Sequence, residues 1–240
     1  MTRLYASDAK LKQCIRRRER RVSLLFILTL AILSPLLFGE IMLASLHKLH
    51  LSSSVALTLM IAMFAGGLVN IPVRRIRRSK DITTHPLAIY GLAELWPELQ
   101  RAVPETIIAV NFGGCLIPVG LALYEIAYLA TLGLSTLIAV IAGCVVNIIV
   151  CYSIARPVQG IGIAMPAFVS PIAAVTLALV LAPEAAPPVA FVIGVVGPLV
   201  GADLLHLRDV EATEIGVVSI GGAGTFDGII LSGILAAYLA

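Results

Sequence analysis

The sequence predicts an all-α, polytopic bundle of transmembrane helices with about seven spans. Three observations predict it: 59% of the 240 residues are hydrophobic, only 13% are charged, and the mean hydropathy is +1.01. A soluble domain has roughly 25% charged residues, and lipid offers no partner to unpaired backbone groups, which favours helices. The apolar segments run without alternation for about 20 residues, the length of a spanning helix and not the pattern of a barrel strand.

Seven apolar segments have this length, so the chain divides into a basic N-terminal segment, 1–22, and a transmembrane domain, 23–240. No cleavable signal peptide is expected, because the first apolar segment is too long and follows a long basic stretch. The spans are expected at 23–45, 54–73, 106–129, 132–154, 161–182, 188–206 and 216–239.

The distribution of Lys and Arg predicts the orientation. With the N-terminus in the cytoplasm, the basic residues of 1–22 and 74–80, together with Arg101, Arg156 and Arg208, all fall inside, and only Lys48 falls outside. This agrees with the positive-inside rule. It predicts an external C-terminus and a multi-pass protein of the inner or plasma membrane. The basic segments are expected to contact anionic lipids and not nucleic acid.

Residues 86–103 are expected to form an amphipathic helix on the cytoplasmic surface, anchored by Trp96. Its apolar side chains share one helical face: Ile89, Leu92, Trp96, Leu99 and Val103.

No metal or cofactor is expected. The four cysteines have no paired spacing, and His47 and His50 lack a third ligand. His206 lies between Asp203 and Asp209 at helical spacing, which could ligate a metal, but it is expected instead to mark the water interface. The sequence does not predict an oligomeric state.

Clusters of Gly and Pro predict broken or re-entrant segments, and such interruptions tend to line sites. Asn111 and Pro118 belong to one of them and are therefore candidate site-lining residues. The first two clusters share Gly-Gly followed by Ile-Pro-Val, which indicates either a repeat or, as the preferred reading, a similar kink. The clusters are GGLVNIPV (66–73), NFGGCLIPV (111–119), GIGIAMPAFVSP (160–171) and GVVSIGGAGTFDG (216–228).

The fourth cluster predicts an extended entry into the membrane. Its glycines disfavour helix and its valines favour an extended chain. The last helix is therefore expected to begin near Thr225 or Phe226, with Asp227 in its first turn, where the helix dipole favours a carboxylate. The residues expected to line a polar pocket here are Gly222, Gly224, Thr225, Phe226 and Gly228.

Asp203 and Asp227 lie in long apolar stretches, where an ionised carboxylate costs at least a few kcal/mol and usually serves a function. They fall at the cytoplasmic ends of two consecutive antiparallel spans with a short connection. Two carboxyls brought into one site cannot both ionise easily, so one keeps a proton. This arrangement suits an aspartyl protease acting on a transmembrane peptide.

The string SIGGAGTFDGIILSGILA, with GADLLHL ahead of it, resembles an uncharacterised prokaryotic integral-membrane family, a domain of unknown function, over most of the chain. That resemblance implies no activity. More distantly, the chain resembles the presenilin and signal-peptide-peptidase (GxGD) type of intramembrane aspartyl protease, which carries one catalytic aspartate late in one span and the second in a Gly-x-Gly-Asp motif that opens the next. By this resemblance Asp203 and Asp227 would be the catalytic pair.

The chain departs from that family pattern in three places. Thr225 and Phe226 separate Gly224 from Asp227, and Ala202 precedes Asp203 where the family has tyrosine. The Pro-Ala-Leu motif has no counterpart after Asp227; Met165-Pro166-Ala167 or Ile117-Pro118-Val119 would have to substitute for it.

Two other functions stay open. The same aspartates could carry protons or cations in a transporter or channel, together with Glu40, Glu125 and the breaks at Asn70 and Asn111. Alternatively, the aspartates could be structural in a membrane scaffold. Glu125 lies near the outer end of its span, where its side chain is expected to reach water.

Overall fold

The computed structural model describes residues 29, 33–34, 36–77, 105–158, 162–208, 216–222 and 228–240. The chain forms two compact units, Met1–Ile41 and Met42–Ala240, and residues 36–41 of the first are helical. The following description concerns the second unit. The basic segment 1–22 and the expected surface helix 86–103 lie outside the described residues.

The second unit is mostly helical. Three helical stretches are long and apolar enough to cross a membrane by length and composition: Phe112–Thr131, Leu134–Ile154 and Pro183–Leu204. These are features of a membrane protein. Its helices are residues 42–48, α2 (Ser53–Gly66), α3 (Ile117–Thr131), α4 (Leu134–Ile154), α5 (Val169–Leu181), α6 (Ala186–Val196) and α8 (Gly228–Leu239), with short helices η4 (Phe112–Leu116), η5 (Pro183–Ala185) and η6 (Gly197–Leu204).

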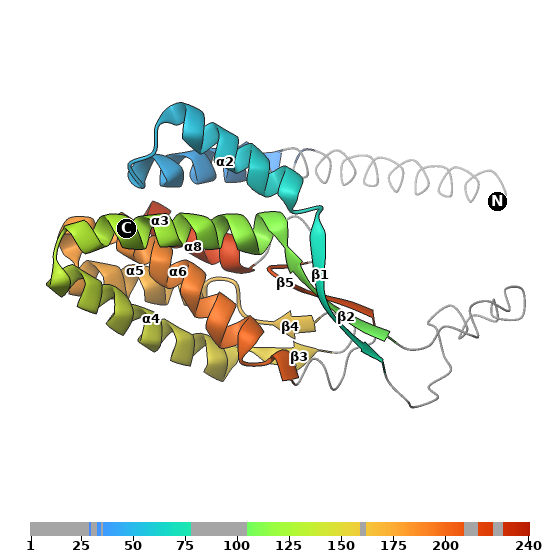
Figure 1. Ribbon diagram of the computed structural model, residues 1–240. Coiled ribbons are helices and arrows are strands. Elements are labelled where there is room, and N and C mark those ends of the chain that lie inside the picture. The colour runs from blue at the N-terminus through green and yellow to red at the C-terminus, as the bar shows by residue number, and fades with distance from the viewer. Residues whose placement is uncertain are drawn as a thin grey trace, which may run out of the picture. The chain divides into compact units, whose positions relative to one another are not determined.

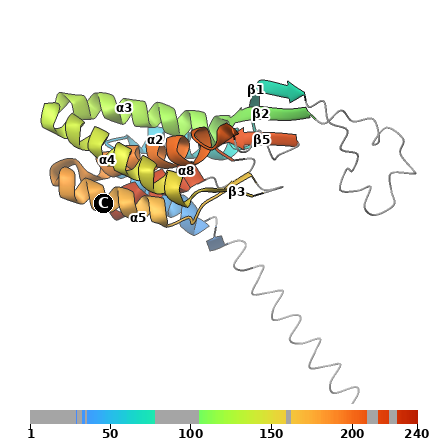
Figure 2. The ribbon, with the colours of Figure 1, turned by 90° about the horizontal axis from the view of Figure 1, so that it is seen from below.

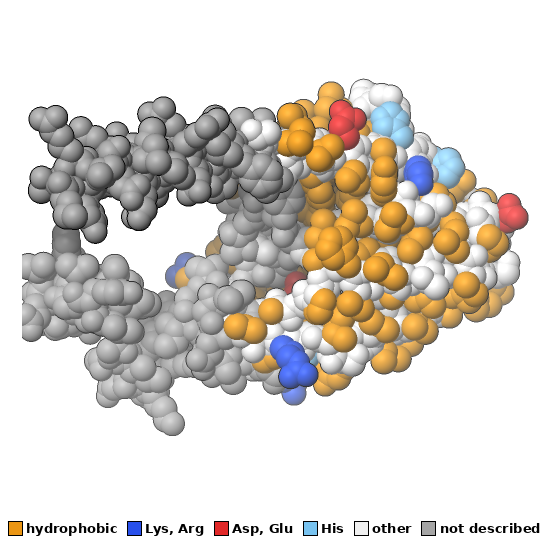
Figure 3. All heavy atoms as spheres, turned by 180° about the vertical axis from the view of Figure 1, so that it is seen from behind, with side chains coloured by type: hydrophobic (Ala, Val, Ile, Leu, Met, Phe, Trp, Pro, Cys, Tyr) orange, Lys and Arg blue, Asp and Glu red, His pale blue; other side chains and the backbone are white. Residues whose placement is uncertain are grey.

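Helix α6 lies at the centre of the bundle and packs against α3, α4, α5 and α8 (Figure 1). Its sequence, APPVAFVIGVV, is apolar on every side, which is the composition of a helix buried all round. By contrast, α4 turns an apolar stripe outward, with Ile138, Ile141, Val145 and Ile149 each at least half exposed. Figure 3 shows hydrophobic side chains over much of one face of the molecule, as lipid contact requires.

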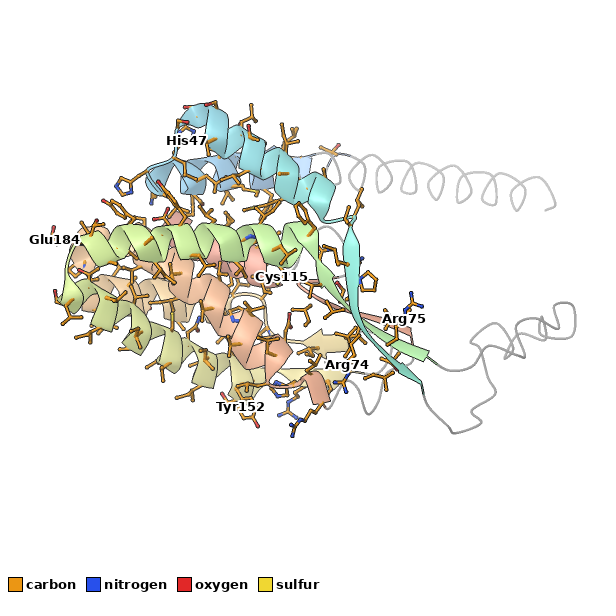
Figure 4. The ribbon with its side chains drawn as sticks, in the orientation of Figure 1. His47, Arg74, Arg75, Cys115, Tyr152 and Glu184 are labelled. Carbon is orange, nitrogen blue, oxygen red and sulfur yellow. The ribbon has the colours of Figure 1, made fainter. Side chains whose placement is uncertain are left out.

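The two ends of this unit can be recognised by residues labelled in Figure 4. Arg74 and Arg75 lie at the strand end of the bundle, whereas His47 and Glu184 lie at the far end. At that far end Lys48 Nζ donates to the carbonyl oxygen of Tyr238, 2.7 Å away, in the last turn of α8. A cation there is favoured by the negative end of the helix dipole. We call these the arginine end and the Lys48 end.

A three-stranded sheet occupies the arginine end, so the expectation of an all-α protein is wrong. It consists of β1 (Asn70–Arg77), β2 (Glu105–Asn111) and β5 (Gly216–Ile220) in the order β1-β2-β5. β1 pairs with β2 antiparallel, and β2 with β5 parallel. The sequences of β2 and β5, ETIIAVN and GVVSI, are rich in β-branched residues, which favour a pleated surface over a helix.

The sheet changes the bounds of two expected spans. The helix of the span at 54–73 ends at Gly66, and the chain then turns into β1. The span at 106–129 begins as β2 and becomes helical only at Phe112. A third expected span, 161–182, starts with β4 (Gly162–Ala164), which pairs with β3 (Arg156–Val158), before α5 begins at Val169.

Helices α6 and α8 run in opposite directions (Figure 1) and cross in close contact at Gly194 and Gly233. A Cβ on Gly194 would lie 2.8 Å from the carbonyl oxygen of Ser232 and 3.0 Å from Cα of Gly233. Only residues without side chains let two backbones approach this closely, as is common between membrane helices.

A buried chain of polar side chains joins four helices near this crossing. Asn147 of α4 donates to Oγ of Ser170 on α5 at 3.1 Å and to the carbonyl oxygen of Ile193 on α6 at 2.9 Å. The hydroxyls of Ser170 and Ser232 of α8 are 2.7 Å apart. Each group is fully or almost fully buried, so these bonds replace water and set how the helices register against one another.

Candidate site at the strand–helix junctions

The two parallel strands β2 and β5 both run toward the helices (Figure 2). A pair of glycines follows each strand. β2 leads through Asn111 to Gly113 and Gly114, and β5 leads to Gly221 and Gly222. The expected extended entry at 216–220 is confirmed by β5. Because Val110 pairs with Ile220, the two chains leave the sheet side by side.

Asn111 holds this junction together. Its side chain is fully buried, and its Oδ1 accepts from the backbone N–H of Gly114 at 2.6 Å, which caps η4. Its Nδ2 donates to the carbonyl oxygen of Gly67 at 2.7 Å and to Oδ1 of Asn70 at 3.0 Å. Oδ1 of Asn70 also accepts from Oγ of Ser219 at 2.6 Å. The network thus ties the start of β1 to the ends of β2 and β5.

The glycine pairs are in backbone contact. A Cβ on Gly114 would collide with the carbonyl oxygen of Gly221. Gly221 and Gly222 both have φ of +83°, a left-handed conformation that other residues rarely adopt. Glycine is therefore required at this junction both for space and for backbone conformation.

Asp203 lies beside the same junction. It is on η6, the π-helical continuation of α6, and its side chain is half-buried. The backbone N–H of Gly221 donates to its Oδ2 at 3.1 Å. This hydrogen bond to a charge-bearing group fixes the position of the carboxylate oxygen. Asp203 is thus anchored to the first residue of the segment that leads from β5 to α8.

His206 is buried, which contradicts the expectation that it marks the water interface. It is only 7% exposed, and its ring lies 4.8 Å from that of Tyr152, centroid to centroid. Its Nδ1 lies 3.1 and 3.0 Å from the carbonyl oxygens of Gly201 and Ala202. Because a carbonyl only accepts, Nδ1 carries the proton.

The structure brings some of the predicted site residues together and leaves others undescribed. Asp203, Asn111 and Gly222 all belong to the junction. Pro118 is buried in the first turn of α3, just beyond η4, where proline is tolerated. Gly228 opens α8, and a Cβ on it would lie 4.0 Å from Cε of Met165. Outside the described residues lie Gly224, Thr225, Phe226 and Asp227.

Ser219 is a site residue that the sequence reasoning missed. Its signal in the sequence was a single hydroxyl in an otherwise apolar strand, close before the glycine pair.

The structure also shows what the similar sequences at 66–73 and 111–119 form. The chain passes from helix to strand at 66–73 and from strand to helix at 111–119, so these two similar sequences adopt different structures. They nevertheless meet, because Asn70 and Asn111 are cross-strand partners.

Comparison with known proteins identifies a family but no activity. No curated protein and no solved structure matches the chain, and no match supports the resemblance to presenilin-type proteases. One family model matches residues 64–239, which include the sheet, the junction and both aspartates. The chain therefore belongs to the family described as "Protein of unknown function (DUF1614)".

Proposed function

We propose that this protein is an intramembrane aspartyl peptidase whose catalytic pair is Asp203 and Asp227. One observation carries the proposal: the Asp203 carboxylate accepts from the N–H of Gly221, six residues ahead of Asp227 in the chain. A half-buried carboxylate is thereby bound to the very segment that bears the second aspartate.

The geometry of α6 and α8 supports a common depth for the pair. The two helices cross at Gly194 and Gly233, and Asp203 follows the first glycine by nine residues, while Gly228 precedes the second by five. At about 1.5 Å per residue, Gly228 lies about 7 Å and Asp203 at most about 13 Å from the crossing, both toward the arginine end. Asp227 directly precedes Gly228 in the sequence.

Such a pair would hydrolyse a peptide bond without a cofactor. The ionised carboxylate takes a proton from water while the water oxygen attacks the peptide carbonyl carbon, and the protonated carboxyl gives its proton to the carbonyl oxygen. When the tetrahedral intermediate collapses, the C–N bond breaks, the departing nitrogen receives a proton from the first carboxyl, and one hydroxyl of the intermediate returns its proton to the second carboxylate. The substrate class is a transmembrane helix or short membrane peptide.

We place this chemistry at the cytoplasmic side of a multi-pass protein in the prokaryotic inner or plasma membrane. Arg74, Arg75, Arg156 and Arg208 all belong to elements at the arginine end, whereas Lys48 belongs to the other. Under the positive-inside rule the arginine end faces the cytoplasm, and its cations meet anionic lipid headgroups.

The test is cleavage of transmembrane peptides by the purified full-length protein in liposomes. Asp203→Asn and Asp227→Asn should each lower the cleavage rate by about a hundredfold or more, the usual contribution of acid–base catalysis. Glu184→Gln, which changes an exposed acid at the Lys48 end, should leave the rate unchanged. Cleavage that persists in both aspartate variants would reject the proposal, as would the absence of cleavage with every transmembrane peptide tried.

A proton- or cation-coupled transporter is the second candidate, and the polar chain of Asn147, Ser170 and Ser232 favours it. These groups cross the bundle interior, and Ser232 lies on α8 five residues after Asp227. Polar side chains inside a membrane often mark ion or proton pathways. Ion flux into liposomes that is lost in Asp203→Asn, without any peptide cleavage, would decide for transport.

A further inference from the structure

Glu125 is a buried carboxyl that the proposed peptidase does not use. It lies on α3 and is only 1% exposed, so the expectation that it reaches water is wrong. Its Oε1 has no hydrogen-bond partner among the described residues. Eight residues separate it from Ile117, the first residue of α3, which puts it about 12 Å along the helix from the junction.

Glu125 is the one charged residue in an otherwise apolar buried face of α3. The buried side chains of α3 form one stripe, and α3 packs mainly on α6, whose side chains are all apolar. Among the described residues, α3 also packs against α2, α4, α8 and η4, and α2 has no ionisable residue. The ionisable groups of the other three form no hydrogen bond with Oε1: Cys115, Cys144, Cys151, Tyr152 and Tyr238.

An ionised carboxylate in this position would cost several kcal/mol, because no described residue replaces the hydration that Oε1 loses. A bound positive charge removes this cost. A hard metal ion takes about six oxygen ligands, and within the described residues there is no group of three His, Cys, Asp or Glu side chains that could hold a metal. The ligand that fits a single carboxyl in apolar surroundings is a proton.

Glu125 lies six residues from Thr131, where α3 ends at the Lys48 end, and eight residues from Ile117, where α3 begins beside the junction. Tyr128 follows Glu125 by one helical turn, and its ring lies 4.9 Å from that of His50, centroid to centroid. His50 is exposed and has a positive φ of 58° in the turn before α2. This ring pair therefore connects the turn of α3 beside Glu125 to the surface.

We propose that Glu125 is a proton-binding site, separate from the aspartate pair, which exchanges its proton with water at the Lys48 end of the bundle, past the ring pair of Tyr128 and His50. The proposal does not depend on the peptidase activity.

The test uses dicyclohexylcarbodiimide, an apolar reagent that reacts with protonated carboxyls inside membranes. The acid O–H adds across one C=N bond, and the O-acylurea rearranges to a stable N-acylurea that carries the whole reagent. Purified full-length protein in liposomes is labelled between about pH 5 and about pH 9, where accessible carboxyls are already mostly ionised. The modified peptides are identified by mass spectrometry.

We expect Glu125 to be modified, exposed Glu184 to be spared, and Glu125 labelling to fall as the pH rises. His50→Ala, which opens the ring pair, should speed the response of labelling to a pH jump. Labelling of Glu125 no greater than that of Glu184 would overturn the proton site. Labelling that does not change with pH would overturn the exchange with water. Infrared difference spectra against Glu125→Gln, which preserves shape, give a second measurement: the carbonyl band of a protonated acid must disappear in the variant.

Discussion

Asn70 and Asn111 face each other across β1 and β2, and Nδ2 of Asn111 donates to Oδ1 of Asn70 at 3.0 Å. The same amide oxygen of Asn70 accepts from Ser219 of β5, so one pair of asparagines connects all three strands. Its buried member also caps the helix that follows β2. The position of the glycine pairs, and of the segment that Asp203 contacts, depends on this connection.

Replacement of Asn111 by alanine should destabilise the protein by about 2–4 kcal/mol, because it removes three hydrogen bonds and leaves buried backbone groups unpaired. Asn70→Ala should cost less, since Asn70 is exposed and water can replace it. Unfolding in detergent, followed by circular dichroism, gives both values. Equal effects of the two variants would contradict the central role of Asn111.

Gly114→Ala should prevent correct closure of the junction, because the added methyl group collides with the backbone of Gly221. The expected loss is about 1–3 kcal/mol, the usual cost of overpacking. Gly120→Ala is the matched control: it lies on α3 with nothing within 4 Å of its Cβ, and alanine should stabilise that helix by up to about 1 kcal/mol. Thermal unfolding of the two variants should therefore shift in opposite directions.

Asp203→Asn and Asp203→Ala should separate structure from chemistry. Asparagine keeps an oxygen that can accept from the N–H of Gly221, so the junction should survive while the carboxylate is lost. Alanine removes both and should also lower the unfolding temperature. The measurements are thermal unfolding and peptide cleavage on the same samples. An Asp203→Asn protein as unstable as Asp203→Ala would mean that the charge itself holds the junction.

Ser170→Ala should weaken the contact between α4, α5 and α8, because Ser170 joins Asn147 to Ser232. Hydrogen bonds between membrane helices are worth about 0.6 kcal/mol on average and up to about 1.7 kcal/mol. Thr176→Ala is a suitable control, since that exposed hydroxyl bonds only to its own helix. The free energy of unfolding in mixed micelles should fall for Ser170→Ala and stay nearly constant for Thr176→Ala.

The sequence alone determined that the chain is mostly helical, that it has long apolar helices and that it belongs with membrane proteins. These conclusions depend on composition and on the length of apolar segments, which act locally. The sequence also predicted the extended entry at Gly216–Ile220, because glycine and valine both disfavour helix.

Only the tertiary structure decided what the local signals left open. β2 and β5 are far apart in the chain, and their pairing depends on contacts that no periodicity within one segment reveals. The same is true of the burial of Glu125 and His206. Each lies near the end of an apolar segment, where water and a neighbouring helix are equally compatible with the sequence. Burial is decided by which helices pack alongside, and here the apolar α6 is one of the helices that pack against α3, whose buried face carries Glu125.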